Sequence, residues 1–220
     1  MMQSRFRSVI FNGIPLWILI LGHIFSVLFL RDLGRGLNQI DDIHVVGFAR
    51  LVHSMHLWVT TWVAPPAIAL IVLLQIQLIR RVPVQWGIDI LGVLLTVRCA
   101  LLFVILNLLL LSHLRAGGML LMQLVLFIPV ITINFGWLYW RLDSAARLRG
   151  HSHIRFSEQV GELDPYDYFH VAAMTLLQFA PSGASPTSRL MKALFVLHGV
   201  MMLDLVALAL SRAIALASGG

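Results

Sequence analysis

The sequence predicts an all-α integral membrane protein, and three observations lead to this prediction. Hydrophobic residues make up 59% of the 220 residues, charged residues make up only 12%, and the mean hydropathy is +0.88. A soluble domain carries about 25% charged residues, so this chain has too little charge to cover a water-facing surface. The apolar residues gather in stretches of about 20 or more, which is the length needed to cross a bilayer. We therefore expect the lipid bilayer to surround most of the chain.

The charge pattern narrows the functional classes. Sixteen basic residues outnumber ten acidic ones, but they lie mostly between apolar runs, where they anchor helices at head groups rather than bind nucleic acid. Cys99 is the only cysteine, so an intrachain disulfide and a thiolate metal cluster are excluded. Because no nucleophile elbow or other signature of nucleophilic catalysis occurs, we expect a protein that is not an enzyme.

Five apolar stretches predict about five transmembrane helices. Pro65 and Pro66 are expected to kink the second stretch, which is too long for one perpendicular span. The fourth ends in Trp137, Tyr139 and Trp140, a cluster typical of a helix that reaches the head groups. The stretches cover residues 9–30, 45–79, 86–112, 119–140 and 189–215.

The segment between the last two stretches indicates a re-entrant pore loop. Residues 168–180 form an apolar piece that is too short to cross the bilayer. Residues 181–186 are rich in proline, serine and glycine, which end a helix, and a full-length span follows at once. Irregular backbone survives at membrane depth only beside protein or a water-filled cavity. A span, a short helix, a loop and a second span therefore predict a pore.

The same segment resembles the pore module of bacterial potassium channels of the two-helix type. That family has a pattern like YFxxxTxTTxGYGDxxP followed by RL, and this chain has Tyr168-Phe169, Thr175, Phe179, Pro186 and Arg189-Leu190 at matching places. The resemblance covers about the last 100 residues. It implies an outer helix at 119–140, a pore helix at 168–177, an inner helix at 189–215, a homotetramer and a bacterial inner-membrane location.

The resemblance divides the chain into an N-terminal transmembrane region, 1–113, and a pore module, 114–220. It implies a channel through which monovalent cations pass, with Gly199 as a hinge in the inner helix. Residues 178–181 replace the family's Gly-Tyr-Gly-Asp, so the sequence leaves the conducted ion open. The residues expected to line the constriction are Thr175, Leu176, Leu177, Gln178, Phe179, Ala180, Pro181 and Ser182.

Ionisable residues inside predicted spans are costly and signal function or pairing. Asp204 either lines the cavity below the constriction or hydrogen-bonds a neighbouring helix, with Arg98 as one candidate partner. A lone Arg98 is too little for a voltage sensor, so we expect it to have a structural partner. His198 is expected to be a hydrogen-bonded histidine between helices.

Two other functions remain open at this point. His53 and His56 share a helix face, and together with His23 they could ligate haem or a metal ion in a membrane subunit. No established metal or haem motif accompanies them, so we expect no cofactor. The second alternative is a non-conducting accessory protein that retains the channel-like fold.

Overall fold

The computed structural model describes most of the chain. It covers residues 2–37, 51, 54–55, 58, 61–62, 64–80, 85–111, 117–157, 163–178 and 183–217. Four residues of the predicted constriction, Phe179 to Ser182, lie outside the described residues, and so do His53 and His56. For Leu176, Leu177 and Gln178 the structure describes the helical backbone only.

The described residues are almost all helical. A ribbon of two three-residue strands is the exception to the predicted all-α fold. The elements in chain order are α1 (Met2–Leu37), α3 (Ala64–Ile79), α4 (Gln85–Leu111), α5 (Gly117–Arg147), β1 (Ile154–Phe156), α6 (Pro165–Gln178), β2 (Ala184–Pro186) and α7 (Arg189–Ala217).

Four of these helices are long and apolar enough to cross a membrane, which makes the chain an integral membrane protein. They correspond to four of the five predicted spans. Their apolar parts are Ile14–Leu33, Gln85–Asn107, Leu121–Arg147 and Arg189–Ser211.

The remaining predicted span, 45–79, lies only partly within the described residues, which include α3. Pro65 and Pro66, which were expected to kink it, lie in the first turn of α3, and the kink itself stays a prediction. Proline suits this place, because the first amides of a helix have no carbonyl partner inside it. With 16 residues, α3 is about 24 Å long, shorter than the hydrocarbon core of about 30 Å.

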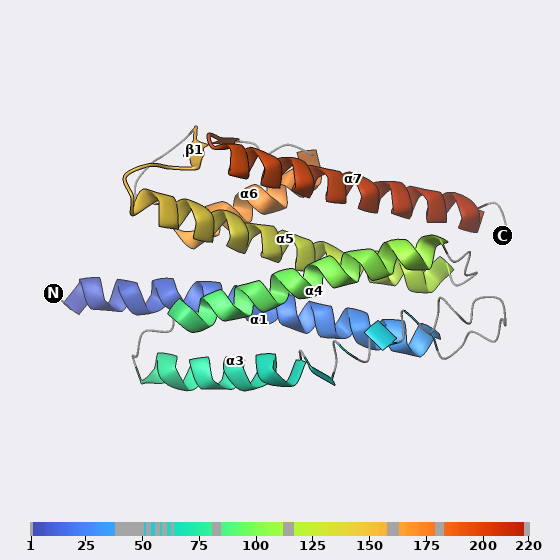
Figure 1. The fold of residues 1–220 in the computed structure, drawn as a ribbon, viewed down its shortest axis with the longest axis horizontal. Helices are drawn as coiled ribbons and strands as arrows, with labels where there is room; N and C mark the ends of the chain where they lie inside the picture. Colours follow the sequence, from blue (N-terminus) through green and yellow to red (C-terminus); the bar gives the residue numbers. More distant parts are fainter. Residues whose placement is uncertain are drawn as a thin grey trace.

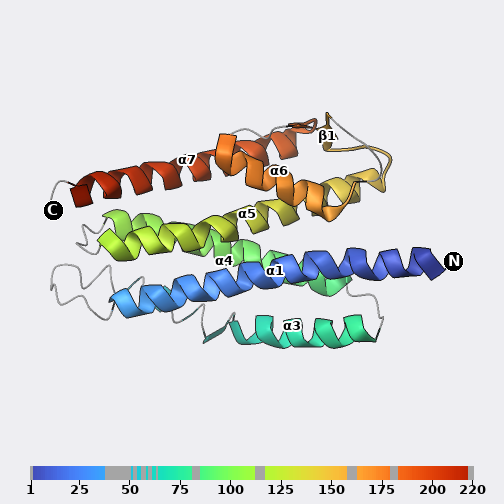
Figure 2. The same ribbon diagram turned by 180° about the vertical axis from the view of Figure 1, so that it is seen from behind.

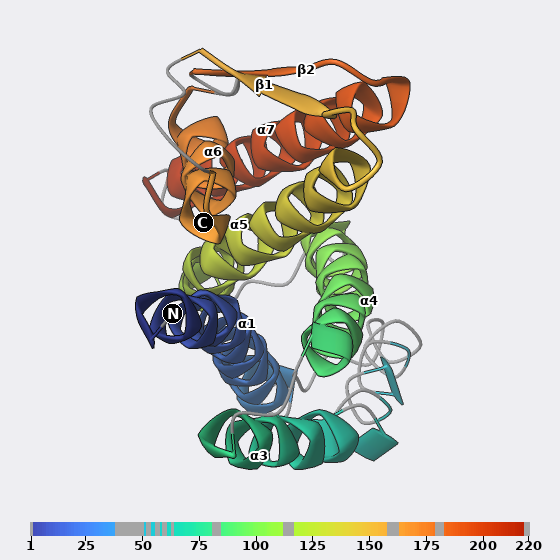
Figure 3. The same ribbon diagram turned by 90° about the vertical axis from the view of Figure 1, so that its left-hand side faces the viewer.

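Helix α5 is the centre of the bundle. It contacts α1, α4, α6 and α7, whereas α3 packs mainly on α4 and α1. Figure 1 shows the long helices running side by side along the longest axis of the molecule, and Figure 2 shows α6 beside α5 and α7 from behind. Seen from the end in Figure 3, α5 separates α6 and α7 from α1 and α4.

Close packing at glycines joins the helices. A side chain at Gly92 of α4 would collide with the Trp137 ring of α5, and one at Gly136 of α5 would collide with the Phe169 ring of α6. Small residues at such crossings let helices approach closely, and in lipid this packing is a main source of association energy.

The aromatic cluster expected at the end of the fourth span lies mostly buried inside the bundle. Trp137 and Tyr139 are buried, and only Trp140 is partly exposed. Trp137 fills the space over Gly92, Tyr139 packs on Phe195 of α7, and α5 continues two turns further to Arg147. The predicted end of the helix at this cluster was therefore wrong, and two of the three aromatic rings pack against neighbouring helices.

The short helix α6 is confirmed, and it starts three residues earlier than the predicted pore helix. Asp164 precedes Pro165, and each of Asp164 and Asp167 accepts a hydrogen bond from the other's backbone amide, at 2.9 and 3.2 Å. This reciprocal arrangement is a capping box, and proline at the first helical position reinforces it. The cap therefore fixes where α6 begins.

Strands β1 and β2 bring the two ends of the α6 segment together. They pair antiparallel, with Phe156 opposite Ala184 and Ile154 opposite Pro186. Gly183 enters β2 with a φ of 73°, a left-handed conformation that glycine adopts without strain. The chain that leaves β1 therefore returns to it after α6, at the same end of α5.

Replacing Gly136 by alanine tests the contact between α5 and α6. The added methyl group meets the Phe169 ring, so we expect a loss of about 1–3 kcal/mol in the free energy of unfolding. The double variant Gly136→Ala/Phe169→Leu should recover part of this loss in the same denaturant titration in detergent micelles. Equal stability of wild type and Gly136→Ala would contradict the close packing.

Candidate functional site

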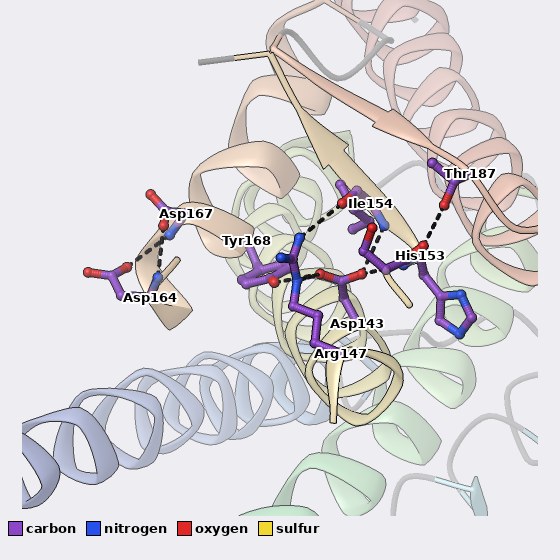
Figure 4. Close-up of polar contacts among 9 residues, drawn as sticks. Asp143, Arg147, His153, Ile154, Asp164, Asp167, Tyr168 and Thr187 are labelled. Carbon is purple, nitrogen blue, oxygen red and sulfur yellow. Dashed lines mark hydrogen bonds and ion pairs between the residues drawn. The ribbon is translucent and has the colours of Figure 1, made fainter. Parts of the chain in front are cut away.

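The Asp143 carboxylate organises the end of α5 where the predicted pore segment begins. It is fully buried and accepts four hydrogen bonds (Figure 4). The Arg147 Nε and the Tyr168 hydroxyl donate to Oδ2 at 2.6 and 2.7 Å, and the amides of His153 and Ile154 donate to Oδ1 at 2.5 and 2.9 Å. One side chain thus connects α5, β1 and α6.

This arrangement replaces water around a buried charge. A buried carboxylate is costly unless its oxygens are all paired, and hydrogen bonds to a charged acceptor are about twice as strong as neutral ones. Burial and the bond to Asp143 raise the pKa of the Tyr168 phenol, so Tyr168 remains a donor. Arg147 also donates to the Ile154 carbonyl at 3.2 Å, which fixes β1 beside the helix end.

Thr175 is the one constriction candidate whose side chain the structure describes. It is buried, and its hydroxyl donates to the Val171 carbonyl one turn earlier in α6, at 2.9 Å. Leu176, Leu177 and Gln178 complete the last turn of α6. The first half of the predicted constriction, 175–178, therefore forms the C-terminal turn of α6.

Asp204 forms a hydrogen bond to a neighbouring helix, as one of its two interpretations predicted. The Asn107 amide of α4 donates to Asp204 Oδ2 at 3.1 Å, and Asp204 remains partly exposed. Arg98 is not its partner. Gly199 lies five residues earlier in α7, within an unbroken helix.

Arg98 has a structural partner, as expected, and that partner is His23. Arg98 is buried and its Nη1 lies 3.1 Å from His23 Nδ1. His23 Nε2 lies 3.2 Å from the Leu91 carbonyl, which can only accept, so Nε2 carries the ring proton and Nδ1 accepts from Arg98. Both ring nitrogens of His23 are therefore engaged within the bundle, which leaves neither free to ligate haem.

His198 is a hydrogen-bonded histidine between helices, as predicted. Its Nδ1 lies 3.1 Å from the Tyr139 hydroxyl, and its ring stacks on Phe135 with centroids 4.1 Å apart. Within the described residues, no group of three or more His, Cys, Asp or Glu side chains could hold a metal ion.

Sequence reasoning missed the partners of several polar residues in the bundle. Arg141 Nη2 donates to Asp89 Oδ2 at 2.6 Å across 52 positions of sequence, and the Thr96 hydroxyl donates to Asn134 Oδ1 at 2.7 Å. Each residue was visible as a polar position near or inside an apolar stretch. The pairing depends on helix order and register, which a single sequence does not specify.

Comparisons of the chain with known protein families, with characterised proteins and with solved structures find no match. The geometry of the chain itself therefore carries the functional argument.

Asp143→Asn tests the carboxylate that joins α5, β1 and α6. The amide removes the charge and turns an N–H group toward backbone donors, so we expect a loss of about 3 kcal/mol or more in the free energy of unfolding. Tyr168→Phe, which removes one bond to that carboxylate, should cost about 1.5–3 kcal/mol.

Thr187→Val is the matched control, because it removes an exposed hydrogen bond of 2.7 Å to the Ser152 carbonyl beside the same ribbon. It should change the free energy of unfolding by no more than about 0.5 kcal/mol. Comparable losses in Asp143→Asn and Thr187→Val would show that the carboxylate does not organise this end.

A double-mutant cycle tests the pair His23 and Arg98. His23→Leu leaves the buried Arg98 Nη1 without its acceptor, and we expect it to lower the free energy of unfolding by about 1–3 kcal/mol. His23→Leu/Arg98→Met replaces both partners by apolar groups and should be more stable than His23→Leu alone. If the two single losses simply add in the double variant, the hydrogen bond does not couple α1 to α4.

Proposed function

We propose that the protein forms a cation-conducting pore of the potassium-channel type, as a homotetramer in a bacterial inner membrane. In this proposal α5 is the outer helix, α6 the pore helix and α7 the inner helix. Residues 175–182 line the constriction, and monovalent cations are the permeating class. The observation that carries the proposal is the path of the chain. After β1 the chain runs beside α5 as α6, and it then returns to pair with β1 through β2.

The position of α6 along α5 supports a re-entrant segment. Tyr168, in its first turn, bonds Asp143, and Phe169 packs on Gly136, which lies further inside the apolar part of α5. Nine more residues carry α6 up to about 13 Å beyond Phe169, away from the ribbon. The end of α6 therefore lies well inside the length of α5, where only protein or enclosed water can satisfy loop backbone.

The ribbon and the caps support a fixed return of the chain. The Ser157 amide donates to the Gly183 carbonyl at 2.8 Å, directly beyond the last paired residues of β1 and β2. The Ser188 hydroxyl accepts from the Met191 amide at 3.2 Å and begins α7. These contacts fix the two points of the chain between which α6 and the predicted constriction lie.

Helix α7 supports an assembled pore, because one side of it packs on no other part of the chain that the structure describes. Val196, Val200 and Leu203 are all more than half exposed on that side. The partly exposed Asp204 lies at the edge of the same surface. A carboxylate facing lipid alone costs about 3 kcal/mol or more, so a cavity enclosed by four copies of α7 gives Asp204 a more favourable environment.

Modification of a single cysteine tests the pore loop. Cys99 is buried and is the only cysteine, so Cys99→Ala gives a background for Ser182→Cys. In proteoliposomes, a cationic methanethiosulfonate reagent should abolish most rubidium flux through Ser182→Cys, because the added group blocks the constriction. Ser152→Cys, exposed in the turn before β1, is the matched control and should keep its flux.

Three outcomes would contradict the proposal. They are wild-type flux no greater than in empty liposomes, equal effects of the reagent on both cysteine variants, and a purified protein that remains a monomer in lipid nanodiscs. Four-fold assembly without flux would favour the accessory-protein alternative.

A further inference from the structure

A regular register between α4 and α5 places a buried glutamine opposite Asn107. The two helices run antiparallel and side by side (Figure 1). Gly92 contacts Trp137, Thr96 bonds Asn134, and Phe103 stacks on Phe127 with centroids 6.3 Å apart. From each of these contacts to the next, an advance of about one or two turns along α4 accompanies a nearly equal step back along α5. One further turn from Phe103 and Phe127 sets Asn107 against Gln123.

Gln123 is completely buried, and neither of its side-chain polar atoms has a hydrogen-bond partner in the part of the chain that the structure describes. A buried amide without partners costs about 1–3 kcal/mol, and the large majority of buried polar side chains in proteins are hydrogen-bonded to protein or to ordered water. The amide therefore indicates a ligand between α4 and α5.

Asn107 and Asp204 supply further oxygen atoms at this position. The Asn107 Nδ2 donates to the Phe103 carbonyl and to Asp204 Oδ2, both at 3.1 Å. Both of its N–H bonds are thereby used, so Asn107 Oδ1 is the group that remains for a ligand. Asp204 brings a negative charge from α7 to the same side chain.

We propose that Gln123, Asn107 and Asp204 form an intramembrane binding site for a monovalent cation. The Oε1 of Gln123, the Oδ1 of Asn107 and the Asp204 carboxylate are hard oxygen ligands, which alkali cations prefer. One carboxylate matches one positive charge, whereas divalent sites usually gather more carboxylates. A water molecule bound to the cation accepts the N–H of Gln123 Nε2, so both ends of the amide are satisfied.

A cation explains the site better than water alone. Neutral water can satisfy Gln123, but it leaves the Asp204 charge uncompensated inside a membrane-spanning helix. The site uses residues of α4, α5 and α7 from a single chain. It therefore requires neither the tetramer nor ion flux, and it can be tested separately from the proposed pore.

Thermal unfolding in detergent micelles measures the site directly. The purified wild-type protein is heated in sodium or potassium chloride and in N-methylglucamine chloride at equal ionic strength. We expect at least one alkali cation to raise Tm in a saturable manner, by about 3–6 °C at ten times its dissociation constant. The large organic cation should not raise Tm, because it cannot enter the site.

Two variants and one control decide the assignment. Gln123→Leu fills the space with an apolar group and should lose at least half of the cation-dependent rise in Tm, and Asp204→Asn should lose all of it. Asn134→Leu removes the hydrogen bond to Thr96 about three turns along α5 from Gln123 and should keep the full rise.

Equal Tm values in all three salts, or an unchanged rise in Gln123→Leu, would overturn the site even if Asp204→Asn fails to fold. A saturable rise in a protein that conducts no ions would keep the site and refute only the pore.

Discussion

The hydrocarbon core offers no partners to polar groups, and this constraint determines how the helices are registered. Several polar side chains of the spans find partners on other helices: Thr96 bonds Asn134, Asn107 bonds Asp204, and Tyr139 bonds His198. A slip of one residue would break these bonds without water to replace them, at a cost of about 1–3 kcal/mol for each buried group. Apolar packing brings the helices together. The polar pairs then select one register among many that would bury a similar apolar area.

The same constraint explains why the end of α5 differs from the other helix ends. Arg147 and Asp143 would both be solvated in an ordinary loop, but here the chain returns through β1 and α6 and buries the carboxylate. Four donors replace the lost water, and three of them come from the segment that follows α5. The charge therefore selects the returning path over a chain that leaves into solvent, which is the local basis of the proposed pore segment.

Sequence alone predicted the elements better than their contacts. Hydropathy identified the stretches that became α1, α4, α5 and α7, and the shortness of residues 168–180 identified α6. The ribbon was missed because β1 and β2 are three residues each and pair across a helix. The burial of Trp137 and Tyr139 depends on Gly92 and Phe195 in other helices. Aromatic residues at a span end look alike whether they face head groups or protein.

Asp204 forms the hydrogen bond that one of its two interpretations predicted, and its role in lining a cavity stays a proposal. Its bond to Asn107 occupies one oxygen, while the side chain stays partly exposed beside the apolar surface of α7. A carboxylate held on one side by an amide keeps a fixed orientation, and its remaining oxygen can still interact with a cation. Arg98 differs because its contact with His23 lies within the buried interior between α1 and α4. Both residues are charged, but only the partly exposed Asp204 can contact an ion, whereas the buried Arg98 connects two helices.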